Sequence, residues 1–191
     1  IQRKYVWDDD QITRLMDSIM LGYPIGTFLF WKVRKSIINK KEYSMYEFIK
    51  DFHERDVYKN PSAPQPFPIG SDEETIWAVL DGQQRLTSLY IALQGSMSRK
   101  LPNKRWKNDD AFPIKELYLD LHSQRTDEED ISYEFKFLTQ EEAKKQKDDK
   151  LWYLVKDILK YSQDELVTDL IIPNGWASDK VAMKNISILL N

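Results

Sequence analysis

A short polar turn between two apolar segments carries the residues best suited to chemistry. Its sequence, Asp-Gly-Gln-Gln-Arg-Leu-Thr, occupies residues 81–87. The apolar run before it, residues 75–80, is typical of a buried strand, and the leucine spacing after it indicates a helix that ends near Gly95. Because the first turn of a helix has unpaired amides and the positive end of the helix dipole, we predict that this turn binds phosphate.

Four residues of the turn are candidates for binding a nucleotide and a metal ion. Gly82 allows a ligand to approach the backbone closely, or allows a positive φ. Arg85 can hold two phosphate oxygens with its planar guanidinium group, and Thr87 can donate a hydrogen bond from its hydroxyl. Asp81, at the end of the predicted strand, could hold Mg²⁺ or polarise a water molecule.

The two glutamines complete the predicted catalytic set. The amides of Gln83 and Gln84 can orient a water molecule or the edge of a base. The predicted catalytic residues are Asp81, Gln83, Gln84 and Arg85. A purely structural interpretation stays open, since Asp81 is a favourable N-cap, Asp-Gly is a common turn pair, and Arg85 could form a surface ion pair. Five consecutive polar or glycine residues between two apolar elements favour a ligand site at a sheet edge.

Two shorter segments have a similar character. Residues 2–7, Gln-Arg-Lys-Tyr-Val-Trp, place Gln2 and Arg3 before a predicted helix start, and residues 24–26, Pro-Ile-Gly, precede a predicted strand. We expect Gln2 and Arg3 to contact the nucleotide as well, although aromatic residues of this segment could simply be core. The predicted nucleotide-binding residues are Gln2, Arg3, Gly82, Gln84, Arg85 and Thr87.

A basic loop around Trp106 is the candidate for binding nucleic acid. Its cationic residues are Arg99, Lys100, Lys104, Arg105 and Lys107. Basic loops that bear an aromatic side chain can hold a nucleic-acid backbone. A solvated surface loop is the commoner explanation of such a charge run.

The composition limits the possible classes of protein. The 191 residues are 41% hydrophobic and 13% aromatic, which is typical of a globular protein with a real core, and the net charge of −3 restricts nucleic-acid binding to local patches. The absence of cysteine excludes disulfides and thiolate chemistry, and the two histidines, His53 and His122, lie far apart. With no secretory signal and no apolar run near the roughly 20 residues of a membrane span, we expect a cytoplasmic protein without membrane contact.

The pattern of elements predicts an α+β fold. We expect one mixed sheet built from strands near residues 4, 28, 77, 118 and 135. The flanking helices include one that starts at residues 8–10 and is ended by Gly22, and one at 43–55. The predicted main domain is 1–160, interrupted by an insertion at about 35–71, and residues 161–191 are the start of a helical extension. Since the chain begins at Ile1 and ends in an apolar run, we expect a fragment of a longer protein.

The three segments at 2–7, 24–26 and 81–87, taken in this order, resemble the N-terminal domain of GmrSD-type modification-dependent restriction endonucleases. That domain is similar to the ParB/sulfiredoxin-like fold. The resemblance is dense over residues 1–33 and 75–95 and looser to about residue 160. In the ParB relatives a Gly-x-x-Arg turn holds nucleotide phosphates, and it corresponds here to Gly82 through Arg85.

The resemblance implies a prokaryotic phage-defence protein that acts on modified DNA. It implies that this domain binds and hydrolyses GTP, ATP, CTP or UTP with Mg²⁺ and senses modified DNA. It also implies that cutting belongs to an HNH-type C-terminal domain or subunit, because this sequence has no His-Asn-His set. Two alternatives stay open: a DNA-binding module without enzymatic activity, and a ParB-like nuclease that cuts DNA itself.

Overall fold

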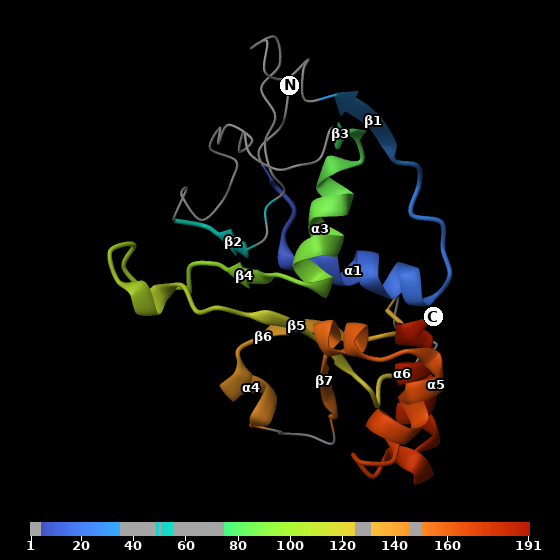
Figure 1. Ribbon diagram of the computed structural model, residues 1–191. Coiled ribbons are helices and arrows are strands. Elements are labelled where there is room, and N and C mark those ends of the chain that lie inside the picture. The colour runs from blue at the N-terminus through green and yellow to red at the C-terminus, as the bar shows by residue number, and fades with distance from the viewer. Residues whose placement is uncertain (1–4, 35–48, 50, 56–74, 125–130, 146–149) are drawn as a thin grey trace.

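The computed structural model describes residues 5–34, 49, 51–55, 75–124, 131–145 and 150–191, and Figure 1 shows the arrangement of their elements. The α-helices are α1 Asp9–Met20, α3 Gln83–Leu93, α4 Gln140–Lys144, α5 Gln163–Glu165 and α6 Lys180–Leu190. The strands are β1 Leu29–Arg34, β2 Asp51–His53, β3 Thr75–Asp81, β4 Ser96–Ser98, β5 Glu116–Asp120, β6 Phe135–Leu138 and β7 Trp152–Leu154. Tighter or wider helical turns cover Asp109–Ala111, Val155–Lys160, Leu166–Ile171 and Trp176–Ser178. The predicted α+β class is therefore confirmed.

Helix α1 shows how local sequence sets an element. Asp8 accepts a hydrogen bond from the Gln11 amide at 2.8 Å, and the Gln11 side chain accepts one from the Asp8 amide at 3.0 Å. This reciprocal capping box satisfies two amides that the helix cannot pair itself. The apolar face that follows is buried as predicted, with Ile12, Leu15, Met16 and Met20 facing the core.

The strands form three separate small sheets among the described residues, so the prediction of one mixed sheet is wrong. β1 pairs antiparallel with β3, β2 pairs parallel with β4, and β5 lies between antiparallel β6 and β7. Both edges of β5 are thus paired. Strand β4 is linked to the residue before β5 by an isolated bridge between Met97 and Lys115. The strand expected near residue 4 lies largely outside the described residues, and residues 5–8 form no strand.

The helix predicted at 43–55 is also wrong where it can be compared. Residues 51–53 form β2, which pairs with residues 96–98. The Ser96 hydroxyl donates to the Asp51 carboxylate at 2.7 Å and ties the two strands together. Tertiary pairing therefore overrides the local helical pattern. Apart from Ile49 and residues 51–55, the predicted insertion lies outside the described residues.

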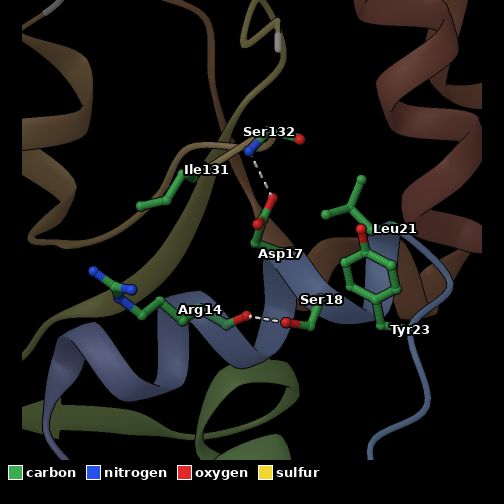
Figure 2. Close-up of a pocket in the computed structure, with 7 residues that line it drawn as sticks. All are labelled: Arg14, Asp17, Ser18, Leu21, Tyr23, Ile131 and Ser132. Atoms are coloured by element: carbon green, nitrogen blue, oxygen red, sulfur yellow. Dashed lines mark hydrogen bonds between the residues drawn. The ribbon is translucent and has the colours of Figure 1, made fainter. Parts of the chain in front are cut away.

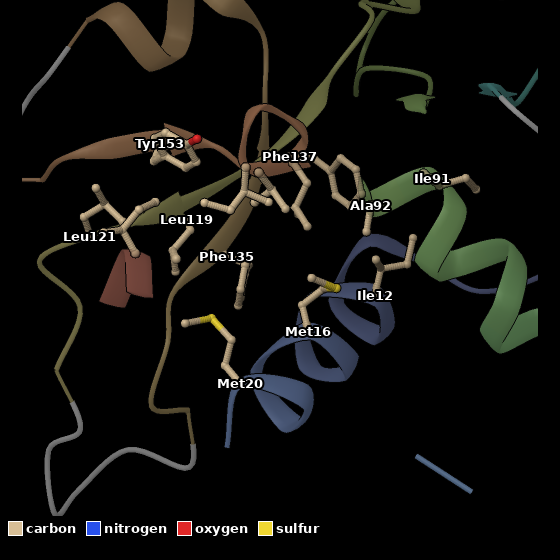
Figure 3. Close-up of a cluster of buried hydrophobic side chains, with 14 of the residues drawn as sticks. Ile12, Met16, Met20, Ile91, Ala92, Leu119, Leu121, Phe135, Phe137 and Tyr153 are labelled. Carbon is tan, nitrogen blue, oxygen red and sulfur yellow. The ribbon is translucent and has the colours of Figure 1, made fainter. Parts of the chain in front are cut away.

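One hydrophobic core joins most of the elements (Figure 3). Side chains from α1 and α3 meet those of β5, β6 and β7, including Ile12, Met16, Ile91, Leu119, Phe135 and Tyr153. The C-terminal helical segment is part of the same core, because Leu170 and Ile186 are buried in it. The helical character predicted for 161–191 is observed, whereas the division of the chain at residue 160 stays a prediction.

A buried carboxylate anchors α1 to the segment before β6. Asp17 is only 5% exposed, and its Oδ1 accepts hydrogen bonds from the amides of Ser132 at 3.1 Å and Tyr133 at 2.7 Å. Figure 2 shows this contact in the wall of a cavity of about 320 Å³. The cavity is lined by Arg14, Asp17, Ser18, Leu21, Tyr23, Ile131 and Ser132.

Replacing this carboxylate should destabilise the fold. Asp17→Ala leaves one buried and one part-buried amide without their acceptor, so we expect a loss of about 2–4 kcal/mol in the free energy of unfolding. Urea denaturation measures it. Asp10→Ala, on the exposed side of the same helix, is the control and should cost under about 1 kcal/mol through the helix dipole. Equal losses in the two variants would show that the Asp17 contact contributes nothing specific.

Candidate functional site

The turn between β3 and α3 needs glycine at its centre. β3 ends at Asp81, and Gly82 is the N-cap of α3 with φ +82°, in the left-handed region. A Cβ on Gly82 would also lie 2.6 Å from Cδ1 of Phe28, well inside van der Waals contact. Both the backbone conformation and the close packing therefore exclude other residues here.

Arg85 links this turn to the loop before β1. Its guanidinium donates to the carbonyl of Ile25 and, at 2.8 Å, to the carbonyl of Thr27. Its Cζ lies 5.1 Å from the centre of the Phe28 ring. Gly26, with φ +83°, leaves room for this contact, because a Cβ there would overlap Nη1 of Arg85. The Pro-Ile-Gly segment and the Asp-Gly-Gln-Gln-Arg segment are thus one structural unit.

The N-terminal segment joins the same unit. The amide of Val6 donates to Oε1 of Gln84 at 3.1 Å, and the Tyr5 hydroxyl is 2.8 Å from the Ser88 hydroxyl. Ser88 in turn donates to the carbonyl of Gln84 at 2.8 Å. Burial raises the pKa of Tyr5 to about 12, against a smaller lowering by the Ser88 hydrogen bond. Gln2 and Arg3 lie outside the described residues.

No side chain among the described residues caps the N-terminus of α3. No side-chain hydrogen bond caps Gly82, and the first turn of the helix has no acidic residue. α1, α4 and α6 each have a side-chain cap, from Asp8, Thr139 and Asp179 respectively. The interpretation of Asp81 as the N-cap is therefore wrong, because the chain turns one residue later. The first amides of a helix have no acceptor within the helix, so they need one from elsewhere.

The positive charge of Arg85 has no carboxylate partner in the described part of the chain. Its hydrogen bonds go to two carbonyl oxygens, which hold the group in place without neutralising it. A guanidinium group has five N–H donors, so some remain for a ligand. The charge therefore lies beside an uncapped helix N-terminus, and both features favour an anion.

The other residues of the turn are divided between structure and surface. Gln83 Nε2 donates to the Val79 carbonyl at 2.8 Å and closes the turn. Thr87 is 7% exposed and lies within the buried side of α3. Asp81 is exposed, and its carboxylate has no hydrogen-bond or ion-pair partner among the described residues. In that same part of the chain, no three His, Cys, Asp or Glu side chains gather as a metal cluster.

The basic loop divides into anchored and exposed cations. Arg99 is committed to the fold, with Nε 2.8 Å from the Asp9 carboxylate and Nη2 2.7 Å from the Trp7 carbonyl. The Lys100 ammonium group donates to the neighbouring carbonyl of Leu101 at 3.2 Å. The exposed cations are Lys104, Arg105 and Lys107, whose side chains have no partner within the described residues.

Comparison with known families decides the relationship. A model of the GmrSD restriction endonuclease N-terminal domain matches residues 1–189. The chain belongs to this family. A search of curated proteins finds no match. The GmrSD assignment gives the chain a role in restriction, which acts on DNA. No helix in the described part of this GmrSD domain is long and apolar enough to cross a bilayer.

Some features of the site could not be read from the sequence. The carbonyl partners of Arg85 lie about 60 residues earlier in the chain. The anchor Asp17 left one weak signal, an acidic residue among apolar ones on a helix. Nothing in the sequence pattern indicated the cavity beside it.

The contact of Gly26 with Arg85 can be tested by a pair of alanine variants. Gly22 and Gly26 both have positive φ, but a Cβ on Gly22 meets nothing within 4 Å. Gly22→Ala should therefore cost only the left-handed strain, about 1–2 kcal/mol. Gly26→Ala should lower the free energy of unfolding by clearly more than Gly22→Ala does, because Arg85 or the loop that contains Gly26 must move. Equal losses in chemical denaturation would contradict a tight contact.

Proposed function

We propose that this domain binds and hydrolyses a nucleoside triphosphate at the turn of residues 81–87 and couples that step to the recognition or cleavage of modified DNA. The cutting itself belongs to an HNH-type nuclease domain or subunit. The observation that carries the proposal is the fixed guanidinium of Arg85 beside the N-terminus of α3, where no described residue supplies a neutralising carboxylate or a capping side chain. GTP, ATP, CTP and UTP share the phosphates that such a site holds.

The residues of the turn suit phosphoryl transfer, which depends on positioning and on stabilising charge. The oxygen of a water molecule bonds to the γ-phosphorus while the bond from that phosphorus to the β–γ bridging oxygen breaks, and the nucleoside diphosphate leaves with the bonding electrons. One proton of the water stays on the inorganic phosphate as its hydroxyl, and the other passes to solvent. Arg85 and the first amides of α3 stabilise the charge on the phosphoryl oxygens. The side-chain nitrogen of Gln83 donates to the Val79 carbonyl, which leaves the side-chain oxygen to orient the water.

Asp81 is the residue that would hold Mg²⁺. Mg²⁺ is commonly bound by one or two carboxylates together with substrate phosphates and water. A single exposed carboxylate that has no partner among the described residues, next to a phosphate site, fits that requirement. The ion would supply further neutralisation of the phosphate charge.

Asp81→Asn is the cleanest test, because the carboxylate makes no contact that supports the fold in the described part of the chain. Mg²⁺-dependent hydrolysis of the preferred nucleotide should fall by about 10²-fold or more, and the unfolding midpoint should not change. Phosphate-release assays with all four nucleotides measure this. The control is Asp110→Asn, another exposed aspartate, which lies in the helical turn Asp109–Ala111 before β5 and should retain full activity.

Arg85→Ala adds a second readout but also removes the anchor of the loop at 25–27. It should abolish nucleotide binding and also lower stability, so binding is compared with circular dichroism on the same sample. The proposal is wrong if no nucleotide binds to the wild type, or if hydrolysis is the same in wild type and Asp81→Asn.

A second candidate function is DNA binding without catalysis, and the three exposed cations at 104, 105 and 107 favour it. Trp106 beside them is 50% exposed. If this loop contacts phosphates, Lys104→Glu with Arg105→Glu should weaken duplex binding and reduce its salt dependence by about two phosphate contacts. Gel-shift titrations with plain and modified duplexes measure this, and unchanged affinity would remove the loop from the DNA interface.

A further inference from the structure

The two-stranded sheet of β1 and β3 has two unlike faces. Its register places Val33 opposite Ile76 and Lys32 opposite Trp77, and residues opposite each other share a face. Val33 and Ile76 are 0% and 8% exposed, so their face is the inner one. The other face, which we call the outer face, carries Phe30, Lys32, Arg34, Thr75, Trp77 and Val79.

The outer face exposes large aromatic side chains. Trp77 is 64% exposed and Phe30 is 45% exposed. Trp and Phe have much to gain from burial, and exposed aromatic side chains grouped on one surface indicate a binding site. No described element covers them.

The same face is cationic. Lys32 Nζ lies 5.5 Å from the centre of the Trp77 ring, and Arg34 is exposed with no hydrogen-bond or ion-pair partner in the described part of the chain. Neither strand contains an acidic residue except Asp81, at the end next to the nucleotide turn. An occupant of this face must therefore be anionic and able to cover aromatic rings.

We propose that the outer face of the β1–β3 sheet binds single-stranded DNA. Unpaired bases stack on Trp77 and Phe30, and the phosphates between them contact Lys32 and Arg34. Aromatic side chains interleaved with cations are the combination by which proteins hold unpaired strands. A duplex hides the faces of its bases and could use only the charges.

This placement deepens the DNA half of the proposed function, and the choice of DNA as the polyanion rests on that function. β3 runs from Trp77 directly into Asp81 and the turn that precedes α3. DNA bound on the outer face and a nucleotide bound at the turn would therefore contact the same short β-strand, β3, near its two ends. That continuity gives the domain a direct route by which one ligand can affect the other.

The test uses the full-length protein and fluorescence anisotropy with a labelled single strand and a duplex of the same sequence. Trp77→Ala should weaken single-strand binding about tenfold or more, and Trp77→Phe should restore most of the affinity. Lys32→Gln with Arg34→Gln should lower the salt slope by about 1.4, that is, two phosphates at about 0.7 each. Lys136→Gln, an exposed lysine of β6, is the matched control and should change neither quantity.

The inference is overturned if the wild type does not bind the single strand at low salt, or if Trp77→Ala binds it as tightly as wild type does. If Trp77→Ala lost duplex binding but kept single-strand binding, stacking of unpaired bases on Trp77 would be excluded. A changed oligomeric state in light scattering with unchanged DNA affinity would make the face a protein interface instead. Nucleotide hydrolysis measured on the same samples separates the single-strand proposal from the proposed function. Trp77→Ala should retain hydrolysis, whereas Asp81→Asn should lose hydrolysis and still bind the single strand.

Discussion

The hydrogen bonds from Arg85 to the carbonyls of Ile25 and Thr27 are the contact on which the rest of the site depends. They join a helix start to a loop that lies about 60 residues earlier in the chain. Because the acceptors are carbonyl oxygens, the contact fixes the side chain but does not cancel its charge. A salt bridge to a carboxylate would have held the arginine equally well, but it would have neutralised the charge that attracts an anion.

Two glycines make that contact possible, and each is required by a neighbour rather than by its own turn alone. Gly26 leaves the space that Nη1 of Arg85 occupies, and Gly82 leaves the space that the Phe28 ring occupies. Phe28 also lies under the guanidinium of Arg85. Close approach of backbone and side chains therefore surrounds the arginine, which limits the motion it must lose on binding a ligand.

Helix α3 connects the site to the hydrophobic core. α3 carries Arg85 at its first turn and buries Ile91 and Ala92 against α1 and the β5–β7 sheet at its other end. Tyr5 and Val6 bind the same helix from the N-terminal side. The helix is thus held along its length, while its N-terminus and the adjoining β1–β3 sheet face outward.

The sequence by itself determined the α+β class, helices α1 and α3, the β3–α3 turn and the family. The elements follow from local rules, namely capping, apolar spacing and a glycine between a strand and a helix. The family follows from sequence motifs that can be recognised without the structure. The sequence could not exclude Asp81 as the N-cap, because that role depends on the residue at which the helix begins, and α3 begins after Gly82. Only the tertiary structure decided that 51–53 pair as a strand, that the sheets are separate, and that three distant segments meet at Arg85 and Gln84. Pairing partners of backbone carbonyls and amides carry no side-chain signature, so contacts of that kind become visible only when the chain is folded.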